Sequence, residues 1–154
     1  MFAAGNCGSG CPDQRCERVV ADTITGANAS RDVLTIAGCD VSGARVGYSS
    51  QGPAIPGMAP RKPDIAAFTH FMGSEALGPG KADIGTSAAC PVAAGCIAAL
   101  RTSPRLSSAL PAVVFDALRK TAHRDTDVDW NPDYGYGIID PVAAAKALEL
   151  IATS

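Results

Sequence analysis

Aromatic residues, histidines and long hydrophobic segments are all scarce in this sequence. Its 154 residues include four Phe, three Tyr and one Trp, against 28 Ala and only two His. A core with so few large rings must be built from small side chains that pack closely. A composition that is 47% hydrophobic and 18% charged nevertheless excludes intrinsic disorder. The length fits one domain, since domains commonly contain roughly 100 to 200 residues.

Three further absences narrow the possible functions. No run of Lys or Arg could neutralise a row of phosphates, and the formal net charge is -2, so nucleic acid is not an expected partner. The longest strongly apolar stretch, residues 88–100, is interrupted by Pro91 and Gly95 and is shorter than the roughly 20 residues of a membrane span. Residues 1–6 lack the basic start and apolar segment of a signal peptide, which leaves the compartment open.

The six cysteines fall into two groups. A polar loop, residues 7–32, holds three of them in the pattern Cys-x3-Cys-x4-Cys with no nearby His: Cys7, Cys11 and Cys16. Zinc sites ordinarily use Cys-x-x-Cys pairs or added histidines. We therefore expect Cys11 to form a disulfide with Cys7 or Cys16 under oxidising conditions, with free thiols as the alternative. The others lie in apolar or small-residue runs and are interpreted as small buried hydrophobic residues: Cys39, Cys90 and Cys96.

The first half of the sequence predicts strands of a parallel sheet. Residues 33–39, Val-Leu-Thr-Ile-Ala-Gly-Cys, form the kind of continuous apolar run expected for a strand buried on both faces. Residues 1–4 are interpreted as the end of another strand, because an apolar run there meets Gly-Asn. Between residues 40 and 85, frequent Gly and Pro predict loops around short extended pieces at 45–48 and 64–68.

A helix is predicted over residues 86–101, with Thr86 as its N-cap. This segment is apolar nearly all round, so we expect the helix to be buried in the middle of the domain. Ser87 is unusual at the start of such a helix, because its hydroxyl would face the positive end of the helix dipole and unpaired backbone N–H groups. That position suits an anion or oxyanion, although composition alone favours a simple capping role for Ser87.

Two more helices are predicted downstream. One would begin at Ser107 or Ser108, with Pro111 in its first turn. The last would occupy residues 140–151, where the pair Asp-Pro supplies a cap and a first-turn proline. Strands followed by helices, together with a fully apolar strand, predict an α/β layered core.

The segment at residues 85–95, Gly-Thr-Ser-Ala-Ala-Cys-Pro-Val-Ala-Ala-Gly, resembles the signature around the nucleophilic serine of subtilisin-like serine peptidases, the subtilases. It does not fit the Gly-x-Ser-x-Gly elbow of the α/β-hydrolases, since position 89 is Ala. Other segments also resemble the family's motifs and occur in the family's order along the chain: residues 2–6, 32–36, 48–53, 62–66 and 134–140. The resemblance implies a three-layer subtilisin-like α/β fold with a mainly parallel sheet, and serine endopeptidase activity on peptide or protein substrates.

The same resemblance implies roles for two residues. Ser87 would be the nucleophile, and its own backbone N–H would be one oxyanion donor. Asn6, which ends the Ala-Ala-Gly-Asn strand, would donate its side-chain amide to the tetrahedral intermediate. Without this context, Asn6 would be interpreted as a turn residue after Gly5. No cofactor is implied.

The resemblance also implies that part of the site lies elsewhere. In the family, the catalytic Asp and His and a strand that forms one wall of the specificity pocket precede the oxyanion asparagine. Residues 1–154 would then be the C-terminal half of a peptidase domain, inactive alone, with Asp and His supplied from outside this chain. The expected source is a second polypeptide, either an N-terminal half separated by cleavage or a separately encoded partner; the alternative is that the same protein carries them in sequence beyond these residues. His70 and His123 both lack the context of the family's catalytic histidine. His70 is an alternative local base, whereas His123 would be a solvated cap at a helix C-terminus.

Three questions stay open at this stage. The chain could instead be a non-catalytic interaction module that binds a partner along an exposed sheet edge. A calcium loop is suggested by the alternating Asp125, Asp127 and Asp129, but Tyr136 stands where such a loop needs Glu, and a solvated turn explains the aspartates equally well. The resemblance would favour secretion, although no signal peptide supports it.

Overall fold

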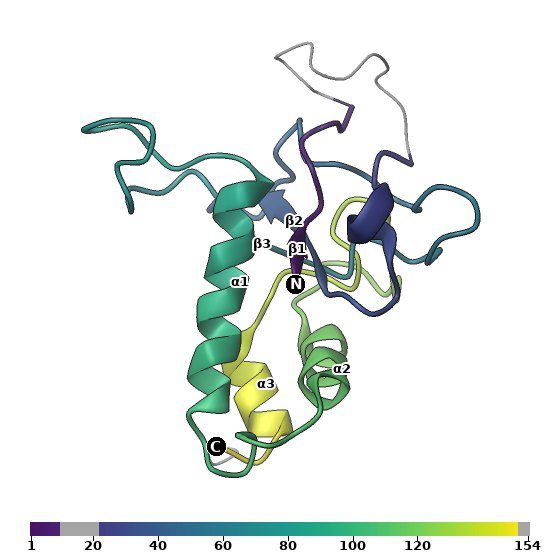
Figure 1. The fold of residues 1–154 in the computed structure, drawn as a ribbon, viewed down its shortest axis with the longest axis vertical. Helices are drawn as coiled ribbons and strands as arrows, with labels where there is room; N and C mark the ends of the chain where they lie inside the picture. Colours follow the sequence, from purple (N-terminus) through teal and green to yellow (C-terminus); the bar gives the residue numbers. More distant parts are fainter. Residues whose placement is uncertain (10–21, 151–154) are drawn as a thin grey trace.

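The computed structural model describes residues 1–9 and 22–150, and Figure 1 shows how they are arranged. The strands are β1 (Phe2–Ala3), β2 (Thr35–Cys39) and β3 (Ile65–Phe68), and a short 3-10 helix, η1, spans Gly26–Ala29. The α-helices are α1 (Thr86–Arg101), α2 (Pro111–Thr121) and α3 (Pro141–Ala147). None of the described helices is both long and apolar enough to cross a lipid bilayer.

The strands form one parallel sheet in the order β1-β2-β3. Phe2 lies opposite Thr35 in the first pair, and Ile36 lies opposite Ile65 in the second. Every residue of β2 is buried, as expected for a central strand that is covered on both faces. The parallel sheet and the helices that follow it confirm the predicted α/β class. Of the extended piece predicted at 45–48, the structure keeps only a single bridge between Arg45 and Cys39.

The two edges of this sheet differ. Residues 136–139 cover the outer edge of β3, where Ala66 donates its N–H to the Gly137 carbonyl and Ile139 donates its N–H to the Ala66 carbonyl, both at 2.9 Å. Among the described residues, β1 has β2 as its only strand partner. The far side of β1 is therefore the open edge of the described sheet.

Helix α1 lies against β2 and β3 and supplies Ala89 and Ala93 to the main hydrophobic core. The prediction that this helix is buried on all sides is wrong. One stripe of its surface is exposed: Ser87, Pro91, Gly95, Ala98 and Ala99. The helix spans the predicted residues 86–101, but its N-cap is Gly85, and Thr86 is its first helical residue. The helix is apolar all round, but only one of its faces has a partner among the described elements.

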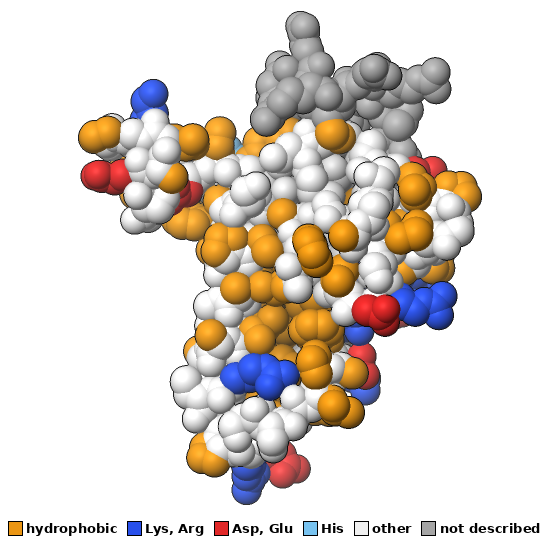
Figure 2. Space-filling model, viewed as in Figure 1, with side chains coloured by type: hydrophobic (Ala, Val, Ile, Leu, Met, Phe, Trp, Pro, Cys, Tyr) orange, Lys and Arg blue, Asp and Glu red, His pale blue; other side chains and the backbone are white. Residues whose placement is uncertain are grey.

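Hydrophobic side chains also gather on the face of the molecule seen in Figure 2. They lie over the middle of the view, where Figure 1 places β1 and the space between α1 and α2. Phe2 of β1 is 42% exposed, which is high for a large apolar residue in a strand. The open sheet edge and the exposed apolar side chains thus belong to one region of the surface.

The other two helices are shorter than predicted. α2 starts at Pro111, not at Ser107 or Ser108, because turns occupy the residues just before it and Leu110 is its N-cap. α3 opens as predicted, with the Asp140 carboxylate accepting a hydrogen bond from the Ala143 N–H at 2.8 Å. It ends at Ala147, short of residue 150, and residue 151 lies outside the described part of the chain.

Candidate active site

The two predicted site residues come from different elements that meet at one end of the sheet. Asn6 follows the carboxyl end of β1, and Ser87 is the second residue of α1. Because α1 begins where the parallel strands end, the helix N-terminus and the end of β1 face each other. Ser87 is exposed at this position, in contrast to the burial expected from the sequence.

Thr86 joins these two elements. The Asn6 side-chain oxygen Oδ1 accepts hydrogen bonds from both the N–H and the hydroxyl of Thr86, each at 3.0 Å. The same hydroxyl accepts a hydrogen bond from the Gly5 N–H at 3.2 Å. With Oδ1 held in this way, the orientation of the Asn6 amide is fixed, and its Nδ2 donor is directed away from Thr86. Sequence reasoning treated Thr86 only as a helix cap and missed this role.

Gly85 keeps a space open between two potential donors. Its backbone has φ +94°, a conformation that strongly favours glycine. A Cβ at this position would lie 3.4 Å from Asn6 Nδ2 and 3.6 Å from the Ser87 backbone nitrogen. Both N–H donors therefore border the same small space beside Ser87. Such a pair, near the positive end of a helix, can bind an oxygen that becomes negatively charged.

Tyr48 and Ser50 hold the turn and the helix start in place. Gly85 donates its N–H to the Tyr48 hydroxyl at 2.7 Å. The Ser50 hydroxyl accepts a hydrogen bond from the Cys7 N–H at 3.0 Å, which fixes the residue after Asn6. Both residues fall in a family-like segment of the sequence, but their contacts across the fold gave no signal in the sequence itself.

Ser87 and Asn6 line a cleft of about 830 Å³. Its wall is mainly apolar and comes from three parts of the chain: Tyr48, the loop at residues 71–85, and the first two turns of α1. The side chains that supply most of this apolar surface include Phe71, Leu77, Ile84, Pro91 and Val92. A peptide bond brought to Ser87 would therefore have an apolar surface beside it.

Neither histidine is hydrogen-bonded to Ser87. His70 lies beside Tyr48, with their ring centroids 6.0 Å apart, and it does not line the cleft. His123 is solvent-exposed, as predicted, and contacts Asp125 through Nε2 at 3.1 Å. It follows the C-cap of α2, which is Ala122. No described residue supplies a hydrogen-bonded base to the Ser87 hydroxyl.

The cysteines and aspartates are the residues that could bind a metal ion in this chain. Cys7 is disulfide-bonded, whereas the expected pairing of Cys11 lies outside the described residues. Cys39 is fully buried as predicted, and Cys90 and Cys96 are half-buried. Within residues 1–9 and 22–150, no group of three His, Cys, Asp or Glu side chains is arranged to hold a metal ion.

The model of the subtilase family matches residues 1–137, so this chain belongs to the subtilase family. The match includes both Asn6 and Ser87. No curated protein matches the sequence.

Solved structures of proteases share the fold, as the resemblance predicts. The prenylagaramide maturation protease PagA has a TM-score of 0.69 at 23% identity, over 96% of this chain and 50% of that one. The CspB protease of Clostridium perfringens has a TM-score of 0.74 at 21% identity, over 92% and 32%. Fervidolysin from Fervidobacterium pennivorans has a TM-score of 0.65 at 22% identity, over 95% and 22%. The chain thus has a subtilisin-like fold but spans at most about half the length of these proteins.

Proposed function

We propose that this chain supplies the nucleophile and the oxyanion donors of a serine endopeptidase. The observation that carries the proposal is that the Asn6 amide and the Ser87 N–H both lie within 3.6 Å of the position that a Gly85 Cβ would occupy, in the cleft that Ser87 lines. This arrangement is typical of a site that stabilises a tetrahedral oxyanion. Membership of the subtilase family supports the same chemistry.

The reaction would be acyl transfer to serine followed by hydrolysis. The Ser87 oxygen attacks the carbonyl carbon of a peptide bond, and a histidine accepts the hydroxyl proton. Asn6 and the Ser87 N–H hold the resulting oxyanion. When the tetrahedral intermediate collapses, the C–N bond breaks and the histidine passes its proton to the leaving amine. Water then attacks the acyl group, with the same histidine as base, and releases the acid and free Ser87.

The catalytic Asp and His would come from polypeptide outside these 154 residues. Two observations support this part of the proposal. No described histidine is hydrogen-bonded to Ser87, and the chain spans about half of PagA. The open edge of β1 and the apolar surface beside it offer a place for the complementary half to dock. The native mass of the purified material would show whether a second polypeptide accompanies this one.

The alternative is a non-catalytic subtilase-like module that binds a partner along the same open edge of β1. Both functions use this edge, so a docking measurement cannot distinguish them. A measurement of peptidase activity distinguishes them.

The test combines this chain with a polypeptide that carries the Asp and His half of a subtilase domain, and measures peptide cleavage. Activity should appear in the mixture, and Ser87→Ala should abolish it without preventing assembly. A matched control is Ser107→Ala, which changes an exposed serine outside the cleft. Assembly without any cleavage would favour the interaction module and contradict the peptidase proposal.

A further inference from the structure

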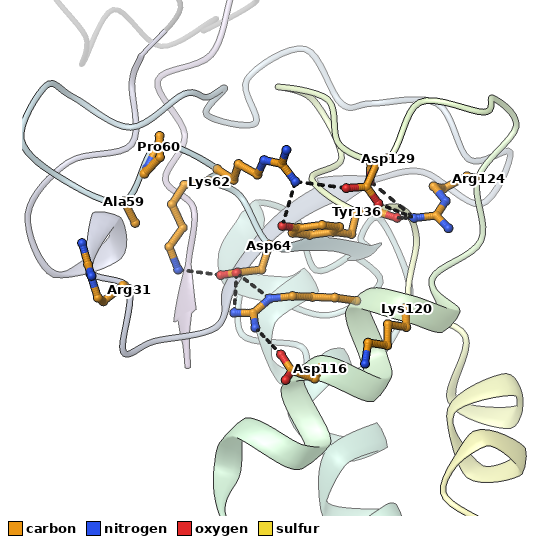
Figure 3. Close-up of a pocket in the computed structure, with 12 residues that line it drawn as sticks. Arg31, Ala59, Pro60, Lys62, Asp64, Asp116, Lys120, Arg124, Asp129 and Tyr136 are labelled. Carbon is orange, nitrogen blue, oxygen red and sulfur yellow. Dashed lines mark hydrogen bonds and ion pairs between the residues drawn. The ribbon is translucent and has the colours of Figure 1, made fainter.

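A second cleft lies at the opposite end of the sheet from Ser87. It has a volume of about 560 Å³ and is bordered by residues 59–62, by α2 and by the segment from Arg124 to Tyr136 (Figure 3). Asp64, which lines it, directly precedes β3, whereas Asn6 follows β1. In a parallel sheet these positions are at opposite ends of the strands, so this cleft is separate from the candidate active site.

The cleft gathers positive charge in a chain that is acidic elsewhere. Its basic residues, which define what we call the basic cleft, are Arg31, Arg61, Lys62, Arg119, Lys120 and Arg124. Three acidic residues also line it: Asp64, Asp116 and Asp129. These six are nearly half of the 13 basic residues in the sequence, which leaves seven basic and twelve acidic residues elsewhere. The positive potential of the molecule is therefore concentrated here.

The acidic residues of the cleft are already matched by cations. Asp64 contacts Lys62 at 2.6 Å and Arg119 at 2.7 Å, and both Asp64 and Lys62 are buried. Asp116 contacts Arg119 at 3.1 Å. None of this negative charge is left to repel an anion.

Asp129 is the most exposed of the three acids, and two arginines hold it. Arg61 contacts it at 3.0 Å and Arg124 at 3.7 Å. Neither Arg31 nor Lys120 has an ion-pair partner in the described part of the chain, and both are exposed. The cleft therefore offers two uncompensated cations and additional N–H donors on arginines that are only partly used.

The cations are spread along the cleft and do not converge on one point. Figure 3 shows Arg31 on one side and Lys120 and Arg124 on the other, with the Lys62–Asp64–Arg119 network between them. A ligand that contacts both Arg31 and Lys120 has to extend across this network. An extended chain with carboxylates at intervals could contact Arg31 at one end and Lys120 at the other.

We propose that the basic cleft binds an extended acidic peptide, a segment rich in Asp and Glu. The binding needs no contact with Ser87 or Asn6, so it does not depend on the chain being a peptidase. Guanidinium groups bind carboxylates in a paired, planar geometry, which suits the arginines here.

The test measures binding of fluorescein-labelled octaglutamate to the full chain by fluorescence anisotropy in 50 mM salt. The double variant Arg31→Gln/Lys120→Gln should weaken binding about tenfold, since it removes two charge contacts. The matched control Lys81→Gln/Arg105→Gln removes the same charge from exposed residues outside the cleft and should leave binding nearly unchanged. Circular dichroism on both variants confirms that they remain folded. Binding should weaken further at 300 mM salt.

Several results would overturn the proposal. One is the absence of octaglutamate binding, and another is an equal loss of binding in the control pair and in the cleft pair. Binding of diglutamate or inorganic phosphate as tight as that of octaglutamate would make the cleft a small-anion site. Tighter binding of an octauridylate would assign it to nucleic acid. The proposal is supported only if octaglutamate binds more tightly than diglutamate, phosphate and octauridylate. This binding must also be weakened in the cleft variant and kept in the control variant.

Discussion

The two ends of the sheet use polar residues in opposite ways. At the amino end, the Asp64 carboxylate accepts hydrogen bonds from Lys62, from both Nε and Nη2 of Arg119, and from the Thr35 N–H, at 2.6 to 3.0 Å. Lys62 also donates to the Val33 carbonyl at 2.6 Å. The buried charged groups of Asp64 and Lys62 are thus hydrogen-bonded within the protein. This network stabilises the fold.

At the carboxyl end, the polar groups are positioned around an open cleft. Thr86 fixes one side of the Asn6 amide, and Ser87 remains exposed at the cleft. A buried charge is stable only when it is fully paired, whereas a catalytic donor must keep capacity for the substrate. The comparison therefore predicts that substitutions at the amino end change stability, and that substitutions at the carboxyl end change catalysis. The following predictions run from the largest expected effect to the smallest.

Asp64→Ala should have the largest effect on stability. It would leave Lys62 buried without a counter-charge, and burial already lowers the pKa of that lysine. Removing one partner of a buried ion pair typically costs about 3–5 kcal/mol. The measurement is the urea midpoint, compared with that of Asp116→Ala, which removes an exposed partner of the same Arg119 and should cost less than about 1 kcal/mol. Equal shifts for the two variants would contradict a structural network centred on Asp64.

Asn6→Ala should have a similarly large effect, but on catalysis. In the complemented enzyme we expect kcat to fall about 100- to 1000-fold with little change in KM, as is typical when one oxyanion donor is removed. The amide would contact an oxygen that is negative only in the transition state. A rise in KM at constant kcat would instead place Asn6 in substrate binding.

Thr86→Val should lower kcat by about tenfold, which corresponds to ~1.4 kcal/mol. Valine has a similar shape but cannot bond to Asn6 Oδ1, so the amide would lose part of its orientation. Thr86→Ser keeps the hydroxyl and should restore most of the activity. If serine and valine at this position gave the same kcat, Thr86 would have a packing role only.

Cys39 lies in the buried middle of the sheet, between the two ends. The difference between its rate of chemical modification and that of the other cysteines is the smallest effect that we expect. Burial raises the pKa of its thiol from 9.0 to about 12, and Asp40 adds to the shift. A raised pKa stabilises the fold below about pH 9, and this contribution is lost as the pH rises toward 12. In native protein at pH 9, iodoacetamide should modify the half-buried Cys90 and Cys96 about tenfold faster than Cys39. Equal modification rates for the three cysteines in the native protein would contradict this account. As the control, the three rates should become equal when the protein is unfolded in urea.

The elements with strong local patterns were predicted well from the sequence. The apolar run ending at Cys39 gave the central strand, and Asp140 with Pro141 gave the start of α3. Helix ends were less accurate, because the residues around Ser107 form turns that no local pattern distinguishes from a first helical turn. The exposure of the outer face of α1 was not predictable either, since it depends on what lies beside the helix and not on the helix itself.

Some features of the candidate site could likewise be predicted from local sequence, and others could not. Ser87 and Asn6 were predicted as site residues because short motifs surround them, and the structure brings both to the same cleft. Thr86 was missed as a partner of Asn6 because a contact between residues 80 positions apart leaves no local pattern. The buried network around Asp64 and the basic cleft were missed for the same reason: they arise when β3, α2 and the segment before Tyr136 come together.

The central claim is that Ser87 is a nucleophile whose base comes from outside this chain. The most direct test is the labelling of Ser87 by a fluorophosphonate, read by mass spectrometry, for the chain alone and for the chain combined with the Asp and His half of a subtilase domain. We predict little labelling of the chain alone and stoichiometric labelling in the complex, with none in Ser87→Ala. Full labelling of the isolated chain that is lost in His70→Ala would contradict the claim, because the base would then lie within this chain.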